Sequence, residues 1–267
     1  MRFQAKDNWH HCKKSRFKIL FNYKKKPHNE KNFSINGKYY RAFYQCSLCD
    51  HIIAFHKFKI NEIYKKDYLD LTYQNEKGLE ERFKYITNLS LKKSDNKNRA
   101  LRINSFFRKK KISILDVGCG TGVFLYEMKK LNHNICGLEL DKRYANFLKQ
   151  KKITVFTKEL ATFKTNKKFD LVTFNKVLEH VYDPLEMLKN SKRLLKQKGI
   201  IYIELPDVEA KIKGKLAGEF CIDHLQIFSL NSLDQLATKS GFKTIKLERI
   251  KEPSGKNTVF GFFKKIS

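Results

Sequence analysis

The chain has 267 residues, a hydrophobic content of 41% and a formal net charge of +29. This content is ample for a core, and no apolar run approaches the roughly 20 residues of a membrane-spanning helix. The charge suggests a nucleic-acid partner, yet only ten of the 56 basic residues are arginine, and the lysines are scattered through every segment. We therefore rank three explanations of the charge. A solvated basic surface comes first, an acidic substrate or an anionic membrane face second, and a nucleic-acid groove third.

The first residues include no apolar segment of the kind that directs secretion. The six cysteines do not form a framework typical of disulfides, and one of them, Cys119, lies inside a glycine-rich turn. Free cysteines are typical of a reducing compartment, so we expect a cytoplasmic protein.

Residues 1–70 are rich in aromatic, lysine and turn residues and show no long helical periodicity, so we expect a small module of short strands and loops. Asn36-Gly37 predicts a hairpin turn before a strand over residues 38–45. Cys46 and Cys49 then form a single C-x-x-C pair. A tetrahedral zinc site needs further ligands, so this pair alone does not define one.

Two helices are predicted within residues 71–110, which we expect to link the N-terminal module to the rest of the chain. The first covers residues 76–89 and places four apolar residues on one face: Leu79, Phe83, Ile86 and Leu89. Ser94 is positioned to cap the second helix, which continues to Phe107.

From residue 111 onward, strands and helices alternate, which predicts an α/β fold with a doubly wound, mostly parallel sheet. The predicted strands cover residues 112–117, 134–140, 153–157, 169–174 and 200–205, and the helices cover 122–132, 142–151 and 184–196. The chain then ends with a helix over 232–240 and two strands over 242–250 and 258–263. A turn at Pro253-Ser254-Gly255 joins these two strands, which predicts a terminal hairpin.

The most informative segment runs from Asp116 to Gly122 and reads D-x-G-x-G-x-G between a strand and a helix. Glycines let the backbone turn sharply and approach a ligand with no Cβ in the way, so the segment predicts a nucleotide-cofactor site. Its spacing differs from the dinucleotide pattern G-x-G-x-x-G. The next strand ends at Glu139, where a carboxylate can accept both ribose hydroxyl hydrogens. Asp141 is the competing candidate, and we expect it to cap the following helix.

This pattern resembles motif I of the class I S-adenosylmethionine-dependent methyltransferases, and the terminal hairpin is typical of that family. The resemblance implies a Rossmann-like seven-stranded sheet over residues 111–267, with S-adenosyl-L-methionine as the cofactor. The glycine loop would pass under its amino-acid end, and residues 158–163 would flank its adenine. The resemblance thereby implies cofactor contacts from Asp116, Gly118, Cys119, Gly120, Gly122, Glu139, Leu140, Glu159, Leu160 and Asn175.

Residues 169–184 resemble the corresponding segment of small-molecule methyltransferases of the ubiquinone-biosynthesis type, and they lack the motifs of DNA base methyltransferases. In the ubiquinone enzymes a Glu-His pair, preceded by an acid, is assigned to a divalent metal. Here Lys176 stands at the place of that acid, and a cation repels a metal ion, so no metal is predicted at Glu179 and His180. The pair either supports the cofactor pocket or places His180 beside the substrate as a base.

Residues 221–230 resemble an H-L-x-x-F-S segment of the same family, for which sugar C-methyltransferases have a His-Glu-His version. Asp223 could orient His224 as a general base. The alternative is structural, with Ser229 to Asn231 capping the last helix and His224 packing beneath it. His180 and His224 are the candidate catalytic residues.

Bacterial relatives with this layout have two C-x-x-C pairs in their N-terminal module. Cys46 and Cys49 match the second pair, whereas the first maps onto residues 9–12, in which Trp9 stands at one cysteine position. The resemblance implies zinc ligation by Cys12, Cys46 and Cys49, with His10 or His11 as the fourth ligand. The alternative is a ribbon-like module without metal.

We therefore predict an S-adenosylmethionine-dependent methyltransferase that acts on a small molecule, with the N-terminal module and the two helices as a lid. The first acceptor class is a nucleotide sugar or a cell-surface glycan precursor, whose phosphates would suit the basic surface. The alternatives are an RNA or protein methyltransferase and a catalytically silent module that binds S-adenosylmethionine.

Overall fold

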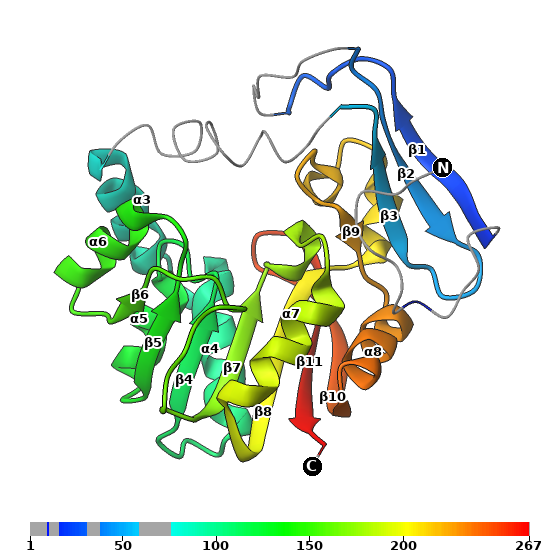
Figure 1. The fold of residues 1–267 in the computed structure, drawn as a ribbon. Coiled ribbons are helices and arrows are strands. Elements are labelled where there is room, and N and C mark those ends of the chain that lie inside the picture. The colour runs from blue at the N-terminus through cyan, green and yellow to red at the C-terminus, as the bar shows by residue number, and fades with distance from the viewer. Residues whose placement is uncertain (1–9, 11–15, 31–37, 59–75, 267) are drawn as a thin grey trace.

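The structure is a computed structural model that describes residue 10 and residues 16–30, 38–58 and 76–266. It contains a sheet of seven strands and a smaller sheet of four strands (Figure 1). The predicted hairpin turn at Asn36-Gly37 and the predicted ligands His11 and Cys12 lie outside the described residues.

The large sheet has the strand order β10-β11-β8-β7-β4-β5-β6. Its strands are β4 (Ser113–Val117), β5 (Asn134–Leu138), β6 (Val155–Phe156), β7 (Phe169–Asn175), β8 (Leu195–Pro206), β10 (Phe242–Lys251) and β11 (Asn257–Lys265). Pairing is parallel from β8 to β6, whereas β11 lies antiparallel between β8 and β10. The predicted seven-stranded sheet with a terminal antiparallel hairpin is confirmed.

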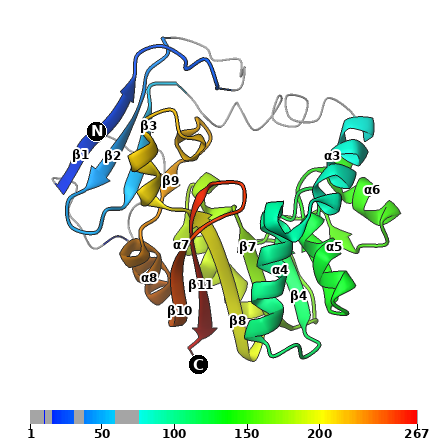
Figure 2. The same cartoon turned by 180° about the vertical axis from the view of Figure 1, so that it is seen from behind.

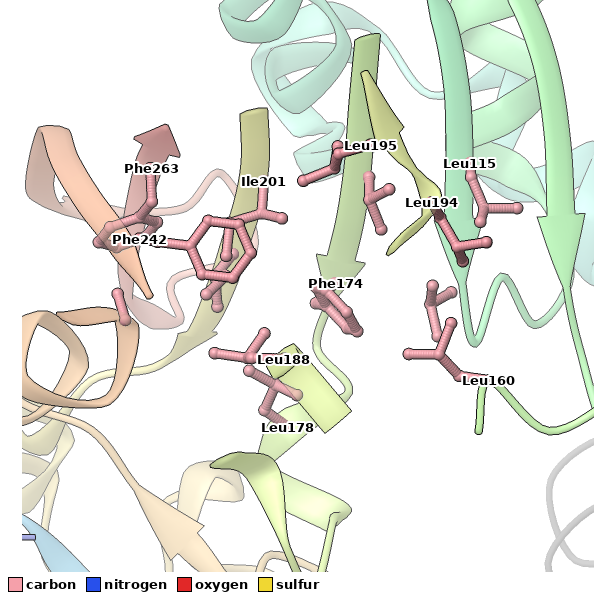
Figure 3. Packing of buried hydrophobic residues seen from close by; sticks show 14 of the residues in the cluster. Leu115, Leu160, Phe174, Leu178, Leu188, Leu194, Leu195, Ile201, Phe242 and Phe263 are labelled. Atoms are coloured by element: carbon pink, nitrogen blue, oxygen red, sulfur yellow. The ribbon is translucent and has the colours of Figure 1, made fainter. Parts of the chain in front are cut away.

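Helices cover both faces of this sheet. Successive side chains of a strand point to opposite faces, so a strand that is apolar throughout needs a cover on each face. The helices are α3 (Glu76–Asn88), α4 (Asp95–Phe106), α5 (Val123–Lys130), α6 (Lys142–Gln150), α7 (Pro184–Ser191) and α8 (Leu230–Lys239). Ile114 of β4 belongs to the core cluster formed with α3 to α6, on the side nearer the viewer in Figure 2. Its neighbour Leu115 belongs to the cluster on the opposite face, where Figure 3 shows Leu188 of α7 among the packed side chains.

Short 3-10 turns connect several of these elements: η2 (Leu91–Lys93), η3 (Leu178–His180), η4 (Lys192–Leu194), η5 (Val208–Lys213) and η6 (Gly218–Phe220). The helix predicted over residues 184–196 is too long, since α7 ends at Ser191. The Ser191 hydroxyl donates to the carbonyl oxygen of Leu188, and Leu195 already pairs with Phe169 of β7. Pairing with the neighbouring strand therefore decides the conformation of residues that have a helical pattern.

The small sheet has the order β1-β2-β3-β9 and combines residues from both ends of the sequence. β1 (Phe17–Tyr23), β2 (Arg41–Cys46) and β3 (Ile52–His56) come from the N-terminal module, whereas β9 (Gln226–Ile227) lies between β8 and α8 in the chain. Ile52 pairs with Ile227 in antiparallel register. The N-terminal module is thus joined by backbone pairing to the region that follows β8.

Among the residues that the structure describes, no helix has both the length and the apolar character needed to cross a bilayer.

A buried ion pair attaches α4 to the end of β8. Arg99 donates from Nε to Glu204 Oε2 over 2.9 Å and from Nη2 to Glu204 Oε1, and Arg102 Nη1 donates to Oε2 over 3.0 Å. Burial opposes ionisation, but the Arg99 guanidinium holds the pKa of the Glu204 carboxyl well below its usual range. Glu204 is thus a buried carboxylate whose charge is balanced by the protein itself.

We expect Arg99→Met to lower the free energy of unfolding by about 3 kcal/mol, because it leaves the buried Glu204 carboxylate without its main counter-ion. Urea unfolding followed by circular dichroism measures the change. The matched control is Lys84→Met, in an exposed pair with Glu80, which should cost at most about 0.5 kcal/mol. Equal stability of the two variants would contradict this role of Arg99.

Candidate active site

The glycine turn after β4 has the conformation that its sequence requires. Gly118, Gly120 and Gly122 have φ angles of 68°, 50° and 68°, in the left-handed region that favours glycine. A Cβ on Gly118 would lie 2.9 Å from the side chain of Val177, whereas a Cβ on Gly120 would meet no atom within 4 Å. The side of the turn next to Gly120 is therefore open to a ligand.

Asp116, at the end of β4, is buried and receives two hydrogen bonds on one oxygen. Thr173 Oγ1 donates to Asp116 Oδ1 over 2.6 Å, and Asn175 Nδ2 donates to the same atom over 2.8 Å. Burial raises the pKa of Asp116 to about 7, although both hydrogen bonds lower it. Both donors are neutral side chains. A positively charged group of a ligand could therefore provide the cation for the Asp116 carboxylate. Thr173 was not predicted, because only the register of β4 and β7 shows it.

Glu139 follows β5 and is attached to the glycine turn. Its Oε2 accepts a hydrogen bond from the Gly120 backbone nitrogen over 2.9 Å, and its Oε1 accepts one from the Asp141 nitrogen over 3.0 Å. The carboxylate is thus fixed beside the open side of the turn. The Asp141 carboxylate accepts from the Arg143 nitrogen over 2.8 Å, so the predicted cap of α6 is confirmed.

The remaining predicted cofactor contacts differ in accessibility. Cys119 and Leu160 are buried, whereas Leu140 is 62% exposed and Glu159 is also exposed. Arg193, which was not predicted, donates from Nη2 to the carbonyl oxygens of Leu160 and Ala161. The segment after β6 is therefore held by an arginine that precedes β8.

A cavity of about 380 Å³ lies beyond the carboxyl end of β7. Residues of the segment after β7, of the segment between β8 and β9, of the β10–β11 turn and of the N-terminal module line it together. The lining residues with charged or imidazole side chains are Glu30, Arg41, Lys176, Glu179, His180, Lys215, Glu219, Asp223, His224 and Lys256. Its volume is typical of sites for small molecules.

The two predicted catalytic histidines meet in this cavity, with ring centroids 4.8 Å apart in an edge-to-face arrangement. Nδ1 of His180 lies 2.9 Å from the carbonyl oxygen of Asp223, and Nδ1 of His224 lies 2.7 Å from that of Glu219. A carbonyl oxygen can only accept, so both Nδ1 atoms carry a hydrogen and donate it. Burial lowers the pKa of His224 to about 3, and His180 lowers it further, so His224 is neutral near pH 7.

Nδ1 of His224 is bonded to the Glu219 carbonyl, so at this nitrogen the ring is oriented by the backbone, and its orientation by Asp223 stays a prediction. The Asp223 carboxylate instead lies 3.7 Å from Nδ1 of His180. The alternative, in which this segment caps the last helix, is confirmed in part, because Ser229 accepts a hydrogen bond from the Ser232 nitrogen and caps α8. His224 nevertheless lines the cavity.

Glu179 lies in η3 and is fully buried. Its ligand atoms and those of His180 and His224 lie within 4.8 Å of one another, a set that could hold a metal ion. The ammonium of Lys176 is hydrogen-bonded elsewhere, because its Nζ donates to Thr258 Oγ1 over 2.7 Å. The predicted absence of a metal at this pair stays a prediction.

A second cluster of metal-ligating residues lies in the N-terminal module. Nε2 of His10 is 2.6 Å from Sγ of Cys49, and the ligand atoms of His10, Cys46 and Cys49 lie within 4.8 Å of one another. Of the two histidines that the sequence left open, the structure thus places His10 at the cysteine pair. The cluster also contacts the large domain, because the Ser229 hydroxyl donates to the carbonyl oxygen of Cys49.

The N-terminal module also holds the segment that forms one wall of the cavity. Tyr23 donates to the carbonyl oxygen of Lys215 over 2.5 Å, and Asn29 donates to that of Leu216 over 3.0 Å. Arg41 Nη1 donates to the carbonyl oxygen of Phe220 over 2.9 Å, and its guanidinium lies 3.7 Å from the centre of the Tyr23 ring. These contacts could not be predicted from the sequence, since the partners lie far apart along the chain.

The seven-stranded sheet, the glycine turn after β4 and the acid after β5 together define a class I S-adenosylmethionine-dependent methyltransferase. Residues 80–247, more than half of the chain, match the profile of the methyltransferase domain family, and the chain belongs to this family.

Two curated relatives have sequences similar to part of the chain. It is 34% identical over 100 residues to the ubiquinone biosynthesis O-methyltransferase of Pelagibacter ubique, across 35% of this chain and 42% of that protein. It is 32% identical over 124 residues to the protein of the same name in Glaesserella parasuis, across 41% and 50% of the two chains. The chain thus spans half or less of the length of these relatives.

Solved structures show the same fold at low sequence identity. The 1,6-didemethyltoxoflavin-N1-methyltransferase of Burkholderia thailandensis, with 1,6-didemethyltoxoflavin and S-adenosylhomocysteine bound, has a TM-score of 0.58 at 14% identity, covering 89% of this chain and all of that one. The glycopeptide N-methyltransferase MtfA has a TM-score of 0.54 at 14% identity, covering 64% and 90% of the two chains. Both similarities concern the fold alone.

The pKa of Asp116 predicts a pH dependence of cofactor binding. If the ionised carboxylate attracts the cofactor's α-ammonium, affinity should rise about fivefold from pH 6 to pH 7.5, while the ammonium is still mostly protonated. Asp116→Asn should bind at least about tenfold more weakly and lose this rise. Titration calorimetry measures both, and Asp141→Asn, which keeps a capping side chain, is the control. An unchanged affinity in Asp116→Asn would refute the role.

Proposed function

We propose that this methyltransferase transfers the methyl group of S-adenosylmethionine to a small molecule held in the cavity. One observation carries the proposal: the same strand end serves both sites. Asn175, the last residue of β7, hydrogen-bonds Asp116 on the cofactor side, and Glu179 and His180, a few residues further on, line the cavity. A cofactor seated over the glycine turn would therefore have its reactive end near the cavity.

In such a transfer an electron pair of the acceptor attacks the methyl carbon in line with the departing sulfur, and positioning supplies most of the rate enhancement. We assign this positioning to the walls of the cavity and to the N-terminal module that holds residues 215–220. His180 and His224 are the proposed groups for hydrogen bonding or proton transfer beside the acceptor. Both rings are held at Nδ1 by carbonyl oxygens, so their orientation is fixed.

The proposed acceptor class is a nucleotide sugar or a cell-surface glycan precursor. Lys176, Lys215 and Lys256 line the cavity, and two of its acids are neutralised locally, Glu30 by Arg41 and Glu219 by Lys213. This distribution supports an acceptor that carries a phosphate at one end. The test incubates the enzyme and S-adenosylmethionine with UDP-linked and dTDP-linked hexoses, and mass spectrometry detects the added methyl group. An acceptor without an anionic group that is methylated in preference to these sugars would overturn the acceptor class.

Cofactor binding tests the reaction class directly. We expect S-adenosylmethionine to bind the purified chain in calorimetry and Gly120→Arg to abolish binding, because the new side chain would fill the open side of the turn. Gly255→Arg is the matched control: Gly255 also has a positive φ angle and open space at its Cβ position, but it lies in the β10–β11 turn. Absence of binding to the unmodified chain, or equal binding by Gly120→Arg, would contradict the proposed function.

A structural zinc ion in the N-terminal module is a second part of this proposal. Thiolate and imidazole are the ligands that zinc prefers, and His10, Cys46 and Cys49 provide three of the four that a closed structural site needs. The family resemblance implies Cys12 as the remaining ligand. The ion would connect residue 10 to the turn between β2 and β3.

Metal analysis of the purified full chain tests this site. We expect about one equivalent of zinc per chain, and a loss of most of it in Cys46→Ser, because removal of a thiolate opens a four-ligand site. Cys221→Ser is the control, since Cys221 lies outside the cluster. Equal zinc content in the two variants would refute ligation by Cys46.

A further inference from the structure

A threonine hydroxyl is buried among apolar side chains on one face of the large sheet. Thr173 lies in β7 and is fully buried, so it cannot touch a ligand. Leu171, two residues earlier on the same face of β7, packs in the apolar cluster that Ile114 of β4 also joins. Valine has nearly the shape of threonine and would suit this position, whereas a hydroxyl is costly to bury without a partner. The hydroxyl therefore requires an explanation.

The partner of this hydroxyl is Asp116. The two residues are paired in the parallel register of β4 and β7, so their side chains point to the same face of the sheet. The Thr173 hydroxyl donates to Asp116 Oδ1 over 2.6 Å. An ionised carboxylate can only accept, so the hydrogen lies on the Thr173 oxygen whenever Asp116 is charged.

The second donor to Asp116 reaches the same oxygen. Asn175 Nδ2 donates to Oδ1 over 2.8 Å, so the bonds from the described residues leave Oδ2 available as an acceptor for a ligand. The two donors differ in exposure, because Asn175 is half-buried at the end of β7 whereas Thr173 is fully buried. Thr173 can therefore affect a bound cofactor only through Asp116.

Other charged and titratable groups face Asp116 from the elements around it. Burial raises the pKa of this carboxyl to about 7, Arg99 of α4 lowers it, and Glu139 after β5 raises it. Two thiols also face the carboxylate, Cys119 from the glycine turn and Cys136 from β5. Burial raises the pKa of both thiols, so they are uncharged near pH 7. Arg99 is thus the one cation in this set.

Thr173 nevertheless lowers the pKa of Asp116 more than Arg99 does. The Arg99 guanidinium is already bonded to Glu204 through two of its nitrogen atoms. A hydroxyl donates a stronger hydrogen bond to a carboxylate than to a neutral carboxyl group, so the Thr173 bond favours the ionised form of Asp116. Because this carboxyl titrates near neutral pH, loss of one such bond changes its ionised fraction several-fold at pH values below 7.

We propose that Thr173 is a positioning residue for the cofactor, which holds Asp116 with Oδ2 left for the cofactor's α-ammonium and favours the ionised form of this carboxylate. This inference rests on the proposed function and adds to it a residue that does not touch the cofactor. The ionised carboxylate attracts the ammonium, so the affinity for the cofactor follows the ionised fraction of Asp116. Without the hydroxyl, that fraction rises only at higher pH.

Thr173→Val removes the hydroxyl and keeps the shape of the side chain. Loss of the bond should change the ionisation constant of Asp116 about fivefold. We therefore expect the variant to bind S-adenosylmethionine about fivefold more weakly than the unmodified chain at pH 6, and about twofold more weakly at pH 7.5. The rise in affinity between these two pH values should increase from about fivefold to more than about tenfold. Titration calorimetry at both pH values measures the change.

Two further variants and a second ligand separate this role from a structural one. Thr173→Ser keeps the hydroxyl and should restore both affinities to within about twofold. Thr244→Val is the matched control, because the Thr244 hydroxyl also donates to an aspartate, Asp234, but belongs to β10, an edge strand of the large sheet. It should leave both affinities unchanged. The second ligand is 5′-methylthioadenosine, which lacks the amino-acid end, so Thr173→Val should bind it as tightly as the unmodified chain does.

The outcomes distinguish this inference from the proposed function. If the unmodified chain does not bind S-adenosylmethionine, the proposed function itself fails. If it binds, and Thr173→Val loses the same factor of affinity at both pH values or loses none, the role of Thr173 is overturned and the proposed function stands. A steeper pH dependence in Thr244→Val, or an equal loss of affinity for 5′-methylthioadenosine in Thr173→Val, would also overturn the role, because the effect would then be a general one on the fold.

Discussion

Parallel pairing of strands β8, β7, β4, β5 and β6 is the constraint on which both sites depend. Each strand is reached by a crossover, so all five end at the same edge of the sheet. This geometry brings Asp116, Glu139 and Glu204 to one edge although they are far apart in the sequence. The terminal hairpin extends the edge, because β10 is antiparallel to β11 and therefore ends on the same side, where Glu252 lies.

Buried carboxylates at this edge have three different environments. Glu204 receives two arginines, so its charge is balanced within the protein and it connects α4 to β8. Asp116 receives two neutral donors, which hold its orientation without balancing its charge. Both carboxylate oxygens of Glu179 are buried and have no hydrogen-bond partner in another residue that the structure describes.

Much of the fold and of the cofactor site could be predicted because the signals are local. The glycine spacing at 118–122, the capping residues Ser94, Asp141 and Ser229, and the alternation of strands and helices each act over a few residues. What could not be predicted depends on register and on distant pairing. Thr173 reaches Asp116 only because β7 lies beside β4, and β8 begins at Leu195 because it pairs with Phe169.

The acceptor side was the least predictable part, for the same physical reason. Arg41 lines the cavity and donates to the carbonyl oxygen of Phe220, and nothing in its own neighbourhood in the sequence points to that partner. The backbone carbonyl of Glu219 accepts a hydrogen bond from Nδ1 of His224, a contact that the adjacent residues in the sequence do not indicate.

The two-residue strand β9 has a consequence for the synthesis of the chain. Ile52 and Ile53 of β3 are buried in the final fold, but their pairing partners are residues 226 and 227, which leave the ribosome long after β3. Until then β3 presents an unpaired apolar edge, and such edges promote aggregation. The lysines that surround the early strands, with the large positive charge of the whole chain, oppose association of unfinished chains through mutual repulsion. The basic composition thus protects the chain until β9 completes the small sheet.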